Sequence, residues 1–130
     1  MKPEDLLYRE SHEWAAIEEE GGSKIATIGI SAFAVEQLTD ITYLALPQIG
    51  KQVAAGEEIG ELESVKAIAS IYSPVTGEVI AVNETLPEKL ELLNDDAYND
   101  GWVAKIRVTD DSSLSGLLDY AAYTKQCQEG

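Results

Sequence analysis

The sequence is poor in the residues that build disulfides and metal sites. Among its 130 residues are one cysteine, Cys127, and one histidine, His12. A single cysteine cannot form a disulfide within the chain, which fits a reducing compartment. One cysteine and one histidine are also too few ligands for a usual zinc site, so no metal is expected. The two can form a catalytic dyad only if the fold brings the chain ends together, and we interpret Cys127 as a spare thiol.

Basic residues are scarce as well. Nine lysines and arginines against 24 aspartates and glutamates give a formal net charge of −15. Nucleic acids and anionic membranes are therefore poor partners, because phosphate groups bind to clusters of basic side chains. The charge favours partner proteins with basic surfaces, or it only keeps the protein soluble.

Long apolar runs and targeting signals are missing. No stretch approaches the roughly 20 consecutive apolar residues of a transmembrane helix. Residues 1–5 show no signal-peptide pattern, so for a bacterial protein we expect a cytoplasmic location. There is also no glycine-rich phosphate-binding loop. The length allows one domain with a real core, and residues 1–130 are predicted to form a single domain.

The most informative residue that is present is Lys66. Residues 61–71 read Glu-Leu-Glu-Ser-Val-Lys-Ala-Ile-Ala-Ser-Ile, with period-2 alternation on both sides of the lysine. Such alternation predicts strand, turn, strand, which places Lys66 at the tip of a β-hairpin. A lysine there is solvated, rigidly presented and easy for another enzyme to reach. That position suits a lysine that is modified, although most exposed hairpin lysines have no function.

Strand patterns dominate the rest of the chain. Residues 24–30, 78–82 and 102–108 alternate in the same way and predict further strands. Ser31 is a good N-cap for a short helix over residues 32–38. Residues 83–100 predict a long polar loop, or one that hides a helical turn. Leucines and alanines at helical spacing predict a C-terminal helix over about 112–126, capped by Ser112 or Ser113.

Short blocks at nearly constant spacing run through most of the chain. The most specific are His-Glu-Trp at residues 12–14 and Glu-Ser-Val-Lys-Ala at residues 63–67. Further blocks lie at residues 28–31, 37–38, 40–41, 46–47, 56–58, 73–79, 82–84 and 101–102. From about residue 8 to residue 108, the sequence resembles the glycine cleavage system H protein family.

The resemblance implies both a fold and a covalent cofactor. The implied fold is mainly β: a flattened barrel or sandwich of two antiparallel sheets with short helices, in which about 24–108 form the lipoyl-binding core. Lys66 is implied to carry lipoic acid in amide linkage, and the protein to be a carrier rather than an enzyme. Glu63, Ser64, Val65 and Ala67 are implied to be recognised by the enzyme that attaches the group.

The resemblance also implies several partner enzymes. A pyridoxal-phosphate glycine decarboxylase loads an aminomethyl group onto a lipoyl sulfur. An aminomethyltransferase moves the one-carbon unit to tetrahydrofolate, and dihydrolipoyl dehydrogenase reoxidises the dithiol. A lipoyl ligase, or a lipoyl or octanoyl transferase, must first modify Lys66.

In this family the loaded arm can rest against the protein surface, and Ser11 and Glu13 match the positions that line this resting site. A carboxylate suits such a site because it can pair with an ammonium group. The simpler interpretation of Glu13 is a solvated acid on an edge strand. His12 is expected to help position that edge rather than act as a base.

Other aromatic and polar residues give weaker signals. Trp14 and Trp102 are interpreted as core residues. Close to Lys66 the sequence departs from the family pattern, because Ser70 stands where aspartate is usual. Fewer acids near the arm change how the resting arm is stabilised.

Three alternative interpretations remain open. The chain can be a lipoyl domain of a 2-oxo acid dehydrogenase or a biotinyl domain, but biotin carriers usually have methionines where Val65 and Ala67 stand. Dehydrogenase lipoyl domains are shorter and lack the His-Glu-Trp block. A stand-alone hydrolase needs an assembled nucleophile and base, which the sequence does not offer. A lipoyl relay, which donates its lipoyl group to other carriers, would use the same modified lysine.

Overall fold

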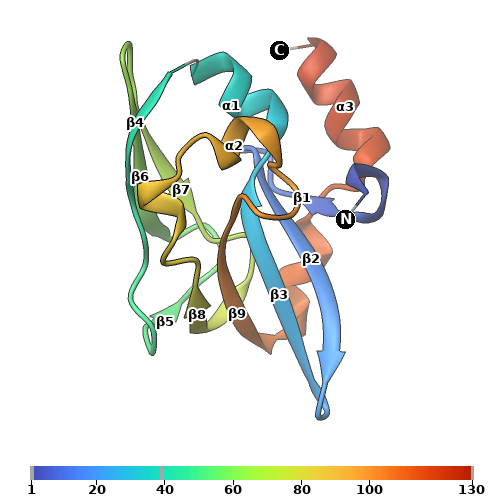
Figure 1. The fold of residues 1–130 in the computed structure, drawn as a ribbon. Helices are drawn as coiled ribbons and strands as arrows, with labels where there is room; N and C mark the ends of the chain where they lie inside the picture. Colours follow the sequence, from blue (N-terminus) through green and yellow to red (C-terminus); the bar gives the residue numbers. More distant parts are fainter. Residues whose placement is uncertain (1, 39, 130) are drawn as a thin grey trace.

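Two antiparallel sheets make up most of the structure, a computed structural model that describes residues 2–38 and 40–129 (Figure 1). The larger sheet has the strand order β1-β2-β3-β9-β8-β5, and the smaller one has the order β4-β6-β7. The strands are β1 (Leu7–Tyr8), β2 (Glu13–Glu20), β3 (Ser23–Ile30), β4 (Ile41–Ala45), β5 (Gln52–Val53), β6 (Glu58–Ser64), β7 (Ile68–Tyr72), β8 (Thr76–Val82) and β9 (Trp102–Asp110). The predicted two-sheet, mainly β architecture is confirmed. Strands β1 and β2 of the larger sheet come before residue 24, where the predicted lipoyl-binding core begins.

The core lies where the two sheets face each other. Leu62 and Ile71 of the smaller sheet belong to the same buried cluster as Ile28, Val79 and Ile106 of the larger sheet. These side chains come from strands whose residues alternate between the core and the outer face. Burying each one contributes about 1.5–3 kcal/mol relative to leaving it in water. The packed core therefore holds the two sheets rigidly against each other.

Short helices close the ends of the sandwich. They are η1 (Pro3–Asp5), α1 (Ala32–Leu38), η2 (Leu86–Glu88), α2 (Leu92–Asp95), η3 (Asp111–Gly116) and α3 (Tyr120–Glu129). The predicted helix after Ser31 is confirmed, and the Ser31 hydroxyl accepts a hydrogen bond from the Ala34 amide at 3.3 Å. Thr39, near its expected end, lies outside the described residues. None of the helices that the structure describes has the length and the apolar composition needed to cross a membrane.

The segment 83–100 contains the helical turns that were one of its two predicted forms. Its elements η2 and α2 turn Leu86 and Leu93 fully into the core. Pro87 suits the first turn of η2, where a missing amide hydrogen costs nothing. The segment is polar in composition but contributes two leucines to the core.

The C-terminal helix begins later than predicted. Instead of one helix over about 112–126, the chain forms η3, a short extended stretch and then α3. The break occurs because the backbone of Leu118 pairs with that of Tyr8, with each amide donating to the other's carbonyl at 2.7 Å. This pairing extends the edge of the larger sheet and outweighs the helical spacing of the leucines. α3 then packs against η1 and β1.

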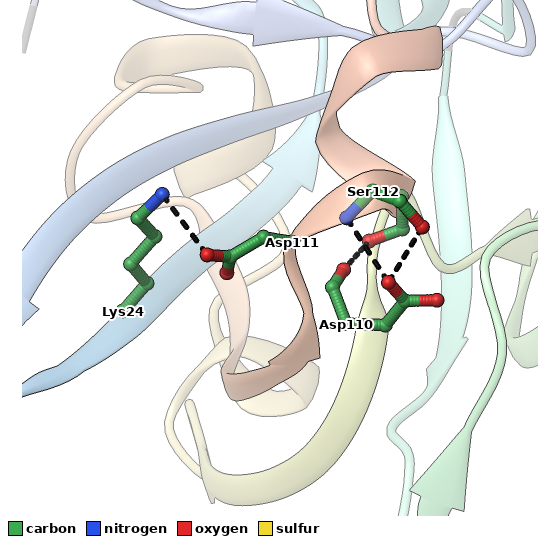
Figure 2. Close-up of polar contacts among 5 residues, drawn as sticks. Lys24, Asp110, Asp111 and Ser112 are labelled. Carbon is green, nitrogen blue, oxygen red and sulfur yellow. Dashed lines mark hydrogen bonds and ion pairs between the residues drawn. The ribbon is translucent and has the colours of Figure 1, made fainter.

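The N-cap of η3 also differs from the prediction, in residue type and by two or three positions (Figure 2). Asp110, not Ser112 or Ser113, is the N-cap, and its carboxylate accepts hydrogen bonds from the amide and the hydroxyl of Ser112. The Ser113 hydroxyl donates to the Asp110 carbonyl at 2.7 Å. Lys24 of β3 pairs with Asp111 at 3.4 Å. These contacts tie the end of β9 to the start of the C-terminal segment.

Candidate functional site

Lys66 lies at the tip of the hairpin formed by β6 and β7. β6 ends at Ser64 and β7 begins at Ile68, so Val65, Lys66 and Ala67 form the turn. The Lys66 side chain is exposed. The tip points toward the end of the molecule where α1 and α3 also lie (Figure 1). Another enzyme can therefore reach the amine without any movement of the fold.

Ser64 holds the turn in shape. Its backbone amide donates to the Ala67 carbonyl at 2.8 Å, which closes the hairpin. Its hydroxyl oxygen accepts from the amides of Lys66 at 3.3 Å and Ala67 at 3.1 Å. The Val65 amide donates to the carbonyl of Asp40 at 3.1 Å, which ties the tip to the segment before β4. Lys66 is thus mounted on a turn whose amides are satisfied.

The outer face of the smaller sheet next to Lys66 is partly apolar. Tyr43, Glu63 and Ile68 are direct partners across β4, β6 and β7, so their side chains share one face. Tyr43 is 49% exposed, Ile68 65% and Val65, in the turn, 67%. Glu63 lies between the two apolar residues of the row. The sequence predicted Glu63 and Val65 as recognition residues, but nothing in it indicated Tyr43 on β4.

A cleft of about 180 Å³ opens beside the hairpin, between the smaller sheet, α1 and the turn before β2. Ser11, Glu13 and Ser70 line it with polar groups, and Leu62 and Ala69 are among its apolar lining residues. The structure therefore brings both predicted resting-site residues to the hairpin that carries Lys66. Ala69 lies three residues after Lys66, which is about 10 Å along a strand.

Glu13 is a buried acid at this cleft, not a solvated one. Its side chain is 1% exposed, and one carboxylate oxygen accepts from the Tyr72 amide at 3.1 Å. The other oxygen accepts from the Ser11 hydroxyl, which in turn accepts from Arg9 at 2.8 Å. None of the ion pairs among the described residues includes Glu13. Burial raises the pKa of Glu13 to about 6.

Ser70, where the family resemblance predicted an aspartate, brings a second acid close to the cleft. The Ser70 hydroxyl donates to the carboxylate of Glu58 at 3.1 Å. Glu58 is 12 residues away in sequence, at the start of β6. No local sequence signal links the two residues, because only the pairing of β6 with β7 brings them together.

His12 lies in an unusual backbone conformation between the two predicted resting-site residues. Its φ is +81°, and its ring nitrogen Nδ1 lies 2.7 Å from the hydroxyl of Tyr123 in α3. Burial lowers the pKa of His12. These contacts agree with a positioning role for His12. Sequence reasoning missed Tyr123, which is 111 residues away.

The other residues that the sequence singled out lie outside the cleft. Trp14 is fully buried and its indole donates to the Ala97 carbonyl at 3.0 Å, while Trp102 is partly buried beneath Lys105. Cys127 and His12 do line a common hollow, so the fold brings the chain ends together. Nδ1 of His12 is hydrogen-bonded to the Tyr123 hydroxyl, however, so that nitrogen is already engaged and does not act as the base of a dyad.

Comparison with known proteins shows that the chain belongs to one family. The family model described as "Glycine cleavage H-protein" matches residues 6–130. A glycine cleavage system H protein from Rhodopirellula baltica is 55% identical over 127 residues, covering 98% of this chain and 96% of the relative. One from Teredinibacter turnerae is 50% identical over 125 residues, covering 96% and 94%.

A solved structure agrees with these sequence relatives. The crystal structure of a glycine cleavage system H protein from Mycobacterium marinum superposes with a TM-score of 0.87 at 30% identity. The match covers 98% of this chain and 99% of that protein. The likeness therefore extends over the sandwich, the hairpin and the C-terminal helix together.

Proposed function

Because the chain belongs to the glycine cleavage H-protein family, we propose that Lys66 is the lysine on which it carries lipoic acid. Proteins of this family are non-catalytic carriers with lipoic acid bound covalently to a lysine. They work with glycine decarboxylase, the aminomethyltransferase and dihydrolipoyl dehydrogenase. The protein thus carries an aminomethyl group between the first two enzymes and electrons to the third.

The observation that supports Lys66 as the modified lysine is its position in the structure. It is exposed at a turn that Ser64 holds with hydrogen bonds, in the middle of the Glu-Ser-Val-Lys-Ala block. Other lysines are engaged elsewhere: Lys24 and Lys51 form ion pairs, and Lys105 lies over the ring of Trp102. Lys66 is the lysine best placed for an enzyme that must close around its amine.

A carrier of this kind needs a rigid base and a flexible arm. The dithiolane of lipoic acid opens by thiol–disulfide chemistry in the active sites of other enzymes, so the carrier itself need not catalyse anything. Tethering raises the effective concentration of the group at each docked enzyme. The sandwich core supplies the base, and Glu63, Ser64, Val65 and Ala67 present the arm and the surface that the lipoyl-attaching ligase or transferase recognises.

The cleft beside the hairpin is the proposed resting place of the loaded arm. An extended lipoyl-lysine is longer than the distance along β7 from Lys66 to Ala69, so its end can reach the cleft. The aminomethyl group carries an ammonium at neutral pH, and Glu13 is a buried carboxylate that forms none of the ion pairs among the described residues. Ser11 holds that carboxylate in place. Pairing there keeps the labile group away from water.

The test is the intact mass of the protein from cells that lipoylate their carriers, followed by peptide mapping. We expect the mass to rise by one lipoyl group, located on Lys66, and Lys66→Arg to abolish the gain while the fold stays intact. Lys24→Arg, at a partly exposed lysine on β3, is the matched control and should still be modified. Biotin on Lys66, or a lipoyl group on another lysine, would contradict the proposal.

We also propose that the protein works in the cytoplasm. The relatives described above are bacterial proteins, and the carrier must meet several soluble enzymes in turn. Cell fractionation of the source organism tests this, with a known periplasmic protein as the control. Recovery with the periplasmic fraction would contradict it.

A further inference from the structure

The turn that carries Ser11 and Glu13 depends on one residue in a rare conformation. His12 has a φ of +81°, in the left-handed region that residues with a Cβ seldom adopt. Such a conformation persists only where surrounding contacts hold it. The His12 amide donates to the Arg9 carbonyl at 2.9 Å, and the His12 carbonyl accepts from the Ser31 amide at 2.9 Å. These bonds tether the His12 backbone, and contacts to its imidazole add to them.

The imidazole is held by the C-terminal helix. The Tyr123 hydroxyl lies 2.7 Å from Nδ1 of His12 and 2.6 Å from the Ser31 hydroxyl, so it links the turn to the N-cap of α1. The Tyr123 side chain is 3% exposed, and its ring stacks on Tyr8 with centroids 4.3 Å apart. Burial raises the pKa of Tyr123, so the phenol stays protonated. On its other side the His12 ring meets Phe33, with centroids 5.2 Å apart.

We propose that Tyr123 is a positioning residue for the resting cleft. Its hydroxyl holds His12 in the left-handed conformation, and this conformation directs Ser11 and Glu13, on either side of His12, into the cleft. If the hydroxyl is removed, His12 can relax, and the carboxylate turns away from the site where the ammonium binds. The inference rests on the proposed function, because it assumes that the loaded arm rests beside Glu13. If it is correct, the C-terminal helix, through Tyr123, affects how long the aminomethyl group stays on the lipoyl arm.

The hydroxyl can be tested apart from the ring. Tyr123→Phe keeps the stacking on Tyr8 and removes only the contacts of the hydroxyl, which are those to His12 and Ser31 and one to the Cys127 thiol. Tyr120→Phe is the matched control, since Tyr120 lies on the same helix, with its ring 6.0 Å from that of Tyr8, and its hydroxyl is outside the His12–Ser31 network. Thermal unfolding of each variant shows whether the fold is intact.

The measurement is the loss of the aminomethyl group from the loaded, lipoylated protein after the decarboxylase has been removed. Water adds at the methylene carbon and the carbon–sulfur bond breaks, which leaves a thiol on the arm. The resulting aminomethanol then loses ammonia by cleavage of its carbon–nitrogen bond and becomes formaldehyde. Nothing is oxidised or reduced in this step. We expect Tyr123→Phe to release ammonia about fivefold faster than the wild-type protein, the factor that the loss of one neutral hydrogen bond implies. Tyr120→Phe should release it at the wild-type rate.

A double-variant comparison separates positioning from general loosening. Glu13→Gln alone should speed release, and adding Tyr123→Phe to it should change the rate no further, because both act through the same carboxylate. An unchanged rate in Tyr123→Phe, or the same acceleration with and without Glu13→Gln, overturns the positioning role. If Glu13→Gln itself has no effect, the resting site in the proposed function fails, and this inference fails with it. If Glu13→Gln speeds release and Tyr123→Phe does not, only this inference is wrong.

Discussion

At the scale of single residues, Glu13 combines two features that rarely occur together. It is almost fully buried, yet its contacts are hydrogen bonds from an amide and a hydroxyl rather than an ion pair. Its bond to the Tyr72 amide also satisfies a donor on β7, an edge strand of the smaller sheet. The residue therefore has a structural role when the arm is absent. An arriving ammonium would add a direct charge partner to the attraction that Arg9 already exerts on Glu13.

The raised pKa of Glu13 makes stability depend on pH in the unmodified protein. Its folded-state pKa is about 6, against 4.5 for an unperturbed glutamate, so the folded state binds the proton more tightly. The stabilisation is fully present below pH 4.5 and is lost as the pH rises through about 6. We expect wild type to lose about 2 kcal/mol relative to Glu13→Gln across this window. Urea unfolding of both proteins at a series of pH values measures it, and a difference that stays constant with pH would contradict it.

Glu63 should act in recognition and not in folding. It lies, half-buried, in the row with Tyr43 and Ile68, three residues before Lys66. We expect Glu63→Gln to slow attachment of the lipoyl group about tenfold, because a contact to a charged group is lost in the enzyme complex. Glu61→Gln, two residues back on the same face of β6, is the control. Rates measured by mass spectrometry with the purified attaching enzyme decide it, and equal rates for both variants would refute the role.

At the scale of elements, the β6–β7 hairpin was predictable because its signal is local. The period-2 pattern and the turn lie within a dozen residues, so Lys66 could be placed at the tip from sequence alone. The partners of Glu13 and His12 could not, since Tyr72 and Tyr123 are 59 and 111 residues away from them. Only the completed sandwich brings those groups together. The proposed resting-site residues were therefore predicted from family resemblance and not from their chemistry.

The C-terminal segment shows where a local signal fails. Its leucines have helical spacing, but pairing of Leu118 with Tyr8 on β1 breaks the helix and delays α3 to Tyr120. Tertiary pairing outweighs helix propensity, which is a weak preference of less than about 1 kcal/mol per residue. The delayed helix places the Tyr123 hydroxyl beside the His12 ring, the contact on which the proposed positioning role depends.

The start of β8 allows no side chain at Gly77. The register between β8 and β9 shifts at this residue, and a Cβ there would overlap the carbonyl group of Arg107. We expect Gly77→Ala to lower the free energy of unfolding by about 3 kcal/mol or more. Gly116→Ala is the control, because a Cβ there meets nothing within 4 Å. Chemical denaturation of both variants tests the claim, and equal midpoints would show that the strands can move apart without cost.

At the scale of the whole molecule, charge is the dominant feature. The 24 acidic side chains exceed the nine basic ones by 15, so most acids have no basic side chain to neutralise them. Ion pairs among the described residues join Lys24 to Asp111, Lys51 to Glu57 and Arg107 to Glu78. The sandwich must therefore hold together against repulsion between its own carboxylates. We propose that residues 1–130 do so as one domain, with a single unfolding transition.

Salt should consequently act in opposite directions on folding and on binding. Screening lengths fall from about 30 Å at 0.01 M salt to about 8 Å at 0.15 M, so added salt weakens repulsion within the protein and attraction to basic partner surfaces alike. We expect the unfolding temperature to rise by a few degrees over that range, and the association rate with the decarboxylase to fall. Calorimetry and stopped-flow binding measure the two effects.

Replacing Glu18 and Glu20, exposed at the end of β2 and away from the Lys66 tip, by glutamine should reduce the gain in stability with little change in binding (Figure 1). An unfolding temperature that falls with salt would mean that the ion pairs, and not the excess acids, dominate the electrostatics of the fold.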